Sequence, residues 1–352
     1  MTQKKTPTHQ IAYAILLTIW VFLGIFFGQI FFSLIFALIP GNLLEQSVWA
    51  TVYSALSYSL SLFIILYFPY KFPRRLPLAT LILSAIILLY YLFILIQYFY
   101  LYLSDYGIGQ SLDSFWRNFT FMGQLGFILA IFGIIFNAVL LSISHQPQKS
   151  TVKNTTKTAH HTDTTPTNTT KTTKSESITT TTDTNSSDSA STSRTALGLS
   201  GLPTWTDIGL APIGYIASLI LGSLLVAFFS VFEWFNVGEA QDVGFNSVYS
   251  GFDRLVTFIA LVVIAPIAEE IIFRGWLYGK LRSFLNIPVS ILIVSAFFGL
   301  MHGQWNVGIT VFAMSVILCL AREFTGTIYS GIIMHMLKNG VAFILLYIVN
   351  VI

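Results

Sequence analysis

Long apolar runs dominate this chain, and their lengths fit helices that cross a membrane. A helix needs about 20 apolar residues to span the hydrocarbon core. Runs that approach or exceed this length occupy 11–39, 47–69, 77–103, 118–143, 210–235, 252–282, 287–303, 306–321 and 326–350. The pattern predicts an all-α fold, a polytopic membrane helix bundle with about nine transmembrane helices.

Composition supports the same class. Of the 352 residues, 55% are hydrophobic and 9% are charged, whereas soluble domains carry about 25% charged residues. The small net charge of +3 gives no basis for nucleic-acid binding, so we expect the lipid bilayer to be the main partner. The single cysteine, Cys319, excludes an intramolecular disulfide and a paired-cysteine metal site.

A polar segment divides the chain in two. Residues 146–204 are dominated by Thr, Ser, Asn and Lys, which offer too little apolar surface to order the chain, so we predict a disordered linker. It separates an N-terminal four-helix membrane module, 1–145, from a C-terminal domain, 205–352. Polar groups in the first module are single amides such as Gln97, Gln124 and Asn137, which favour helix–helix hydrogen bonds rather than chemistry.

Basic residues set the expected orientation, because Lys and Arg concentrate in cytoplasmic loops. With nine spans, one side receives Lys4, Lys5, Lys71, Arg74, Arg75, Lys280, Arg282, Arg322 and the linker lysines. The other side receives Asp105, Asp113, Glu233, Glu239, Asp242 and Asp253. We therefore expect a multi-pass protein of the cell membrane with its N-terminus and linker in the cytoplasm and its C-terminus outside.

Ionisable groups inside three of the apolar runs are the main functional signal. Glu269 and Glu270 lie in one run, His302 in the next, and His335 in the last. Such groups are costly at membrane depth and therefore indicate a functional site. The cytoplasmic ends of these helices are taken as Arg282, Asn286 and Arg322. Measured from these ends, the three groups lie about 20–24 Å along their helices, so we expect them at one level.

The spacing within each run divides the roles. Residues four apart share a helix face, which predicts pairing of Glu270 with Arg274, and also pairs His335 with Asn339. Glu269 lies about 100° around the helix from Glu270 and is expected to face the histidines. A water-shielded carboxylate such as Glu269 would serve as a general base for water, which a neutral histidine beside it would help to hold. A second histidine and an Asn amide would stabilise an oxyanion, so the set predicts amide or ester hydrolysis without a covalent intermediate.

Three motifs carry a resemblance to a known family. Glu269–Arg274 resembles the EExxxR motif of the type II CAAX prenyl endopeptidases, also called CPBP or Abi intramembrane proteases. Phe298–His302 is similar to their FxxxH motif, and His335–Asn339 to their HxxxN/D motif. Over roughly 200–350 the resemblance implies an intramembrane endopeptidase domain acting on a peptide or membrane protein. It implies Glu269, His302, His335 and Asn339 as catalytic residues, with Glu270, Arg274 and Phe298 in support.

The same residues and fold are compatible with other functions. Glu269, His302 and His335 match a hydrolytic zinc ligand set, although the chain has no HExxH signature, so we expect no cofactor and keep zinc as the alternative. A non-catalytic membrane scaffold or a bacteriocin-immunity protein could use the same fold. A proton-coupled transporter is disfavoured because no inverted repeat is apparent.

Overall fold

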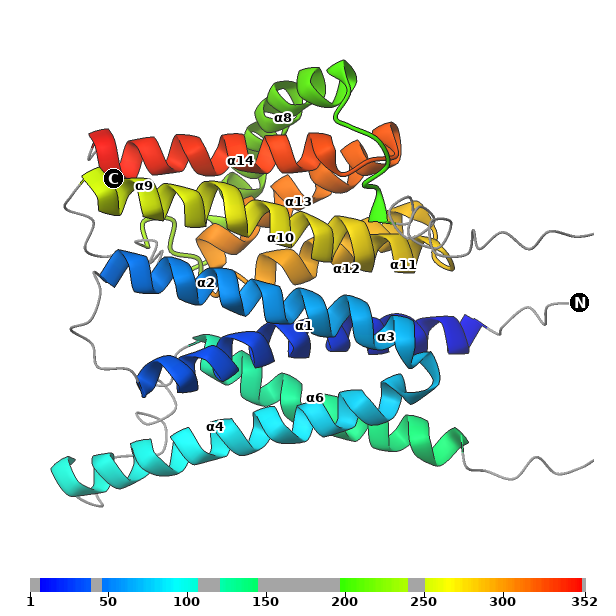
Figure 1. Cartoon of the computed structure of the whole chain (residues 1–352), viewed down its shortest axis with the longest axis vertical. Helices are drawn as coiled ribbons and strands as arrows, with labels where there is room; N and C mark the ends of the chain where they lie inside the picture. The colour runs from blue at the N-terminus through cyan, green and yellow to red at the C-terminus, as the bar shows by residue number, and fades with distance from the viewer. Residues whose placement is uncertain (1–6, 39–45, 107–120, 145–196, 240–250, 350–352) are drawn as a thin grey trace, which may run out of the picture.

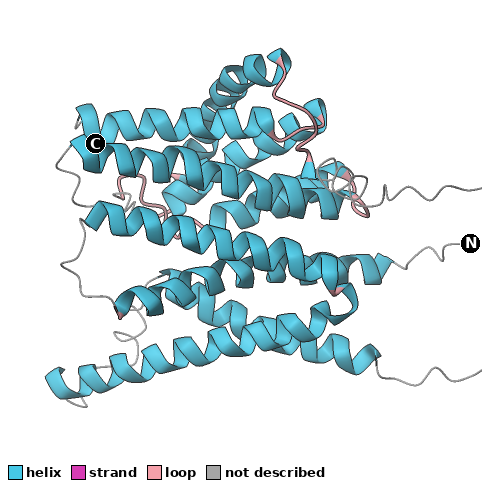
Figure 2. Cartoon of the chain, in the orientation of Figure 1, coloured by secondary structure: helices cyan, strands magenta, loops and turns pink. Residues whose placement is uncertain are grey.

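The protein is a helical bundle in every part that the computed structural model describes (Figure 2). The described residues are 7–38, 46–106, 121–144, 197–239 and 251–349. Seven helices in these ranges are long and apolar enough to cross a membrane, and Phe127–Leu140 and Ile287–Leu300 are shorter apolar helices. The predicted all-α membrane bundle is confirmed, and the nine predicted spans correspond to seven long helices and these two shorter ones.

The first module consists of four helical stretches. Its elements are α1 (Pro7–Ala37), α2 (Gln46–Leu62) continued by η1 (Phe63–Tyr67) and α3 (Phe68–Lys71), η2 (Pro73–Arg75), α4 (Leu76–Tyr106) and α6 (Phe121–Ser144). Helices α4 and α6 pair with each other and lie beside α1 (Figure 1). Pro73 opens the short turn between α3 and α4, where three basic residues follow one another closely.

The second half surrounds one helix of unusual form. Its elements are α8 (Trp205–Phe229), α9 (Gly251–Phe258), η3 (Ile259–Ile264), α10 (Ala265–Glu270), η4 (Ile271–Tyr278), α11 (Gly279–Arg282), α12 (Ile287–Leu300), α13 (Trp305–Thr325), α14 (Tyr329–Ile344) and η5 (Leu345–Val349). The stretch from α9 to α11 is continuous, with π-helical hydrogen bonding in η3 and η4. This continuity is the condition on which the predicted depth of Glu269 depends.

Helix ends follow local sequence signals. Thr204 and Asp207 form a capping box that starts α8, and the side chain of Asn286 accepts the Val289 N–H at the start of α12. Gly326 ends α13 at a φ of 72°, a left-handed conformation that other residues adopt only with strain. These caps fix where the helices of the second half begin and end.

Both halves contribute to one buried core. Leu17 and Leu23 of α1 belong to the same cluster as Ile272 and Leu277 of η4 and Phe298 of α12. Helix α2 lies directly against α9, η3 and α10 (Figure 1). The domain boundaries stay a prediction, and linker residues 145–196 lie outside the described ranges. Just after them, Gly198 accepts a hydrogen bond from the backbone N–H of Ile328.

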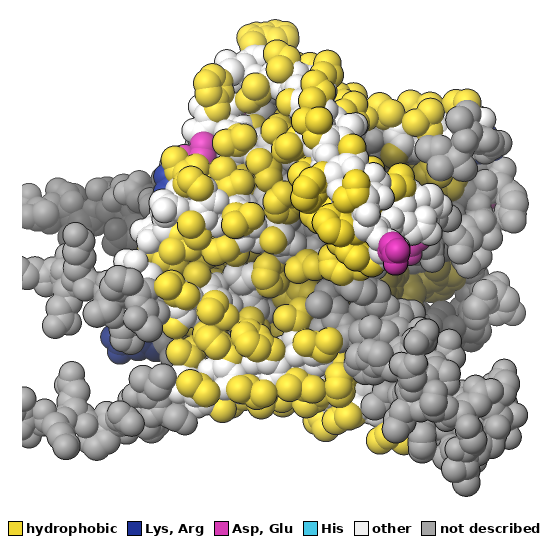
Figure 3. All heavy atoms as spheres, turned by 180° about the vertical axis from the view of Figure 1, so that it is seen from behind, with side chains coloured by type: hydrophobic (Ala, Val, Ile, Leu, Met, Phe, Trp, Pro, Cys, Tyr) yellow, Lys and Arg dark blue, Asp and Glu magenta, His cyan; other side chains and the backbone are white. Residues whose placement is uncertain are grey.

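The bundle has a broad apolar side and two polar ends. Figure 3 shows hydrophobic side chains covering most of the visible flank, with the charged side chains near its ends. The start of α1 and the end of α14 lie at opposite ends of the bundle, as an odd number of crossings requires (Figure 1). These features make the chain a multi-pass membrane protein. Which end faces the cytoplasm stays a prediction.

Candidate active site

The two carboxylates lie where the long helix changes its hydrogen bonding. Glu269 and Glu270 end α10, between the π-helical segments η3 and η4. A π-helical turn holds an extra residue, shifts the faces that follow it and occurs frequently at functional sites. Glu270 is fully buried, whereas the Glu269 side chain keeps 17% of its surface exposed. Of the two carboxylates, only Glu269 is therefore accessible from the surface of the protein.

Glu270 belongs to a buried ion pair. Arg274 Nη1 donates to Glu270 Oε1 at 2.8 Å, and both side chains are almost completely buried. The Arg274 guanidinium also lies 4.2 Å from the ring centroid of Phe298, a cation–π contact. The pairing expected from the four-residue spacing is present. It holds the Glu270 carboxylate in place and leaves Glu269 outside the pair.

His335 lies between the two carboxylates. Its Nδ1 is 3.2 Å from Glu270 Oε1, and its Nε2 is 3.8 Å from Glu269 Oε2. An ionised carboxylate only accepts hydrogen bonds, so Nδ1–H must be the donor to Glu270. The Glu270–Arg274 pair thus sets the orientation of the imidazole and directs Nε2 toward Glu269.

Phe298 brings both histidines to one ring. His302, just beyond the end of α12, has its ring centroid 5.2 Å from that of Phe298, and His335 lies 5.8 Å away. His302 Nδ1 donates to the Phe298 carbonyl at 2.8 Å, which leaves Nε2 of the neutral ring as an acceptor. His335 Nε2 in turn lies 3.8 Å from Glu269 Oε2. The structure therefore gathers the three groups that the sequence predicts at one depth.

The Asn339 amide donates to a backbone carbonyl, whereas its predicted role is to stabilise an oxyanion. Its Nδ2 donates to the Leu261 carbonyl at 2.8 Å. In the π-helical pattern of η3, that carbonyl would accept from the N–H of residue 266, which is Pro266 and has none. The amide replaces the missing donor and ties α14 to η3. The amide group has a second N–H, which this contact leaves available.

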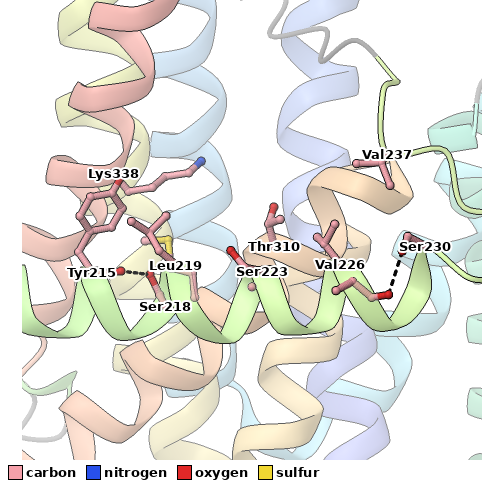
Figure 4. A pocket seen from close by; sticks show the side chains of 12 residues that line it. Tyr215, Ser218, Leu219, Ser223, Val226, Ser230, Val237, Thr310 and Lys338 are labelled. Atoms are coloured by element: carbon pink, nitrogen blue, oxygen red, sulfur yellow. Dashed lines mark hydrogen bonds between the residues drawn. The ribbon is translucent and has the colours of Figure 1, made fainter.

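A groove lies among three helices of the second half. It has a volume of about 420 Å³ and lies between α8, α13 and α14, lined mainly by small and apolar side chains such as Ser218, Leu219, Gly222, Val226 and Met314. Figure 4 shows Lys338 extending from α14 over one end of this groove. Lys338 lies three residues after His335 on α14, so the groove reaches the helix that carries His335 and Asn339.

The zinc alternative was tested against the donor geometry. Within the described ranges, no three His, Cys, Asp or Glu side chains are grouped closely enough to hold a metal ion. His335 Nδ1 is engaged by Glu270, and Nε2 is 3.8 Å from the nearest Glu269 oxygen. We therefore derive no step through a metal, and zinc stays an alternative.

The comparisons with known proteins agree with the motifs. Residues 251–341 match the family model of the type II CAAX prenyl endopeptidase Rce1-like proteins. The resemblance predicted from the three motifs is confirmed for this region, which supports a CAAX-type intramembrane protease at the level of the family. All seven predicted site residues lie inside the matched range. No curated protein and no solved structure gave a match.

One polar contact at the site comes from outside the Rce1-like region. Tyr58 of α2 donates its hydroxyl to Glu269 Oε1 at 2.6 Å. The sequence analysis missed this residue, because it found only amides of structural interest in the first module. Tyr58 is one of several tyrosines in the apolar run 47–69, and nothing in its spacing distinguishes it from Tyr53 or Tyr67. Only the packing of α2 against α10 identifies it.

Proposed function

We propose that the protein is an intramembrane endopeptidase of the CAAX-protease type that uses water activated by Glu269. The observation that supports the proposal is the pair of contacts that holds this carboxylate in place. One oxygen accepts the Tyr58 hydroxyl, the other faces His335 Nε2 at 3.8 Å, and the side chain is partly exposed. A carboxylate fixed in this way, in a setting that limits water, is suited to act as a general base.

In the proposed reaction, a water molecule is held between Glu269 Oε2 and His302 Nε2, both of which accept its hydrogens. Glu269 takes one proton as the water oxygen attacks the carbonyl carbon of the scissile peptide bond. The tetrahedral intermediate then collapses, the carbon–nitrogen bond breaks, and Glu269 returns the proton to the leaving amine. No covalent enzyme intermediate is needed.

The negative oxygen of the intermediate requires donors. With its Nδ1–H bound to Glu270, His335 would offer Nε2–H to the oxyanion when both ring nitrogens carry protons. That Nε2–H and the second N–H of Asn339 are the proposed oxyanion donors. Glu270, Arg274 and Phe298 support them by fixing the His335 ring through the contacts already described.

The proposed substrate is a peptide segment of a membrane protein that lies in the groove between α8, α13 and α14. The groove is apolar along most of its length and reaches Lys338 of α14, three residues after His335. We further propose that the protein lies in the cell membrane with its N-terminus and linker in the cytoplasm, following the distribution of basic residues.

The test compares membrane-derived peptides, with their new C-termini mapped, in cells that express wild type, Glu269→Gln or Glu233→Gln at matched levels. Glu233 is exposed and lies outside the site, so its substitution controls for the loss of a carboxylate. We expect a set of products with wild type and Glu233→Gln that is absent with Glu269→Gln.

Identical peptide sets from all three proteins, each folded and in the membrane, would contradict proteolysis and favour the scaffold or immunity alternative. A chelator applied to the purified protein tests the zinc alternative separately. We expect peptide cleavage to persist in its presence, because the proposed water is activated by a carboxylate rather than by a metal.

A further inference from the structure

The contact between Tyr58 and Glu269 joins two regions that are far apart in the sequence. The hydroxyl of Tyr58 lies 2.6 Å from Glu269 Oε1, whereas the family match begins only at residue 251. We infer that Tyr58 is a positioning residue for the general base, so that the active site is completed by α2 of the N-terminal module. This inference rests on the proposed role of Glu269.

The chemistry of the contact explains what Tyr58 does. A phenol that donates to a carboxylate forms a short, charge-assisted hydrogen bond, which is stronger than one between neutral groups. It occupies Oε1, so Oε2 is left as the oxygen that faces His335 and takes the proton from water. It also restricts a flexible glutamate side chain to one orientation. General-base catalysis is sensitive to such placement.

Helix α2 is held so that this donor stays in reach. Thr51 Oγ1 donates to the Val256 carbonyl of α9 at 3.2 Å. Thr51 and Tyr58 are seven residues apart, close to two helical turns, and therefore lie on the same face of α2. That face lies against the long helix α9–α11, so one interhelical contact supports the packing and a second one reaches the base.

The chain offers matched controls for a purely structural role. Tyr53 is on the same helix, but its hydroxyl donates to the Gln29 carbonyl of α1 and not to the site. Tyr53→Phe therefore removes the same chemical group from α2 without touching Glu269. Thr51→Val removes the α2–α9 hydrogen bond and leaves the Tyr58 contact in place.

The experiment uses the full-length protein in lipid vesicles and the peptide that the wild type cleaves in the cellular screen. We expect Tyr58→Phe to lower kcat by about ten- to a hundredfold with little change in KM, because Glu269 is misplaced while the groove is intact. Tyr53→Phe and Thr51→Val should retain wild-type kcat.

A second readout needs no substrate. The infrared difference between wild type and Glu269→Gln isolates the carboxylate stretch of Glu269. Tyr58→Phe should shift this band, and Tyr53→Phe should leave it unchanged. The shift reports the contact itself, independently of the rate.

The outcomes separate the two proposals. Wild-type kcat and an unshifted band in Tyr58→Phe, together with an inactive Glu269→Gln, would overturn the role of Tyr58 alone. An equal loss of kcat in Thr51→Val would also overturn it, because packing of α2 would then explain the effect. Full cleavage by Glu269→Gln, or no product specific to wild type, would overturn the proposed function and the inference with it.

Discussion

The helices α9–α14 and the helices α1 and α2 enclose the same site, but they differ in what they place there. The first group buries Glu270, Arg274 and His335, three ionisable side chains that contact one another. In α1 and α2 the buried side chains are almost all apolar or small hydroxyls, and the contact of Tyr58 with Glu269 is their polar link to the site.

The two groups of helices therefore have different tasks. Interacting charges must be held on rigid neighbouring helices, because a buried charge without its partner is strongly unfavourable. A single phenol needs no such network and can come from any helix that packs closely enough. The region that matches the family therefore contains the proposed reacting groups, while α1 and α2 provide packing and one donor.

The largest expected effect comes from breaking the ion pair in the first group. Arg274→Met removes the partner of Glu270 and leaves its carboxylate buried, which costs about 3–5 kcal/mol in comparable buried pairs. We expect a large fall in the unfolding midpoint in detergent. Denaturation followed by circular dichroism measures it.

Arg282→Met on the same continuous helix is the matched control. Arg282 pairs with Glu323, but their side chains are 31% and 28% exposed. Pairs of this kind contribute about 0–1 kcal/mol. Equal losses from both substitutions would show that burial does not distinguish the two pairs and would weaken the contrast between the regions.

A smaller effect should follow from moving Glu270 without removing it. A Cβ at Gly331 would lie 2.8 Å from Glu270 Oε2, closer than van der Waals contact allows. Gly331→Ala should displace this carboxylate and, through it, the His335 ring. We expect a fall in kcat of about a hundredfold, as a misplacement near 1 Å produces, with the protein still folded. Peptide cleavage by purified protein measures it.

Gly340 on the same helix provides the comparison. A Cβ there would lie 3.7 Å from Val262, which is ordinary contact. Gly340→Ala should therefore keep wild-type activity. If both alanine variants behave alike, the position of Glu270 does not control the site.

Much of this arrangement could be predicted because it depends on short-range sequence properties. The length of each apolar run predicts its helix, and the four-residue spacing predicts the pairing of Glu270 with Arg274. The common depth of Glu269, His302 and His335 follows from counting residues along helices, provided that the helix from α9 to α11 is continuous. Each of these inferences uses only residue counts along individual helices.

The remaining features depend on which helices are neighbours, and a single sequence does not contain that information. Tyr58 resembles the other tyrosines of α2 until α2 packs against α10. The contact of Asn339 with Leu261 arises because Pro266 leaves a carbonyl without a donor and α14 lies next to it. The linker predicts where the two modules meet in the sequence. It does not reveal that side chains of both halves share one core.

The smallest effect expected is that of cutting the linker, and it tests the shared core directly. A protease recognition sequence introduced between residues 150 and 190 allows the chain to be cut after folding. Because α1 and α2 pack with η3, α10 and η4, the two fragments should stay associated in detergent and keep Tyr58 at Glu269. We expect unchanged peptide cleavage and co-elution on size-exclusion chromatography, with protein treated with inactivated protease as the control. Separation of the fragments, or loss of activity on cutting, would mean that the linker rather than the core holds the two regions together.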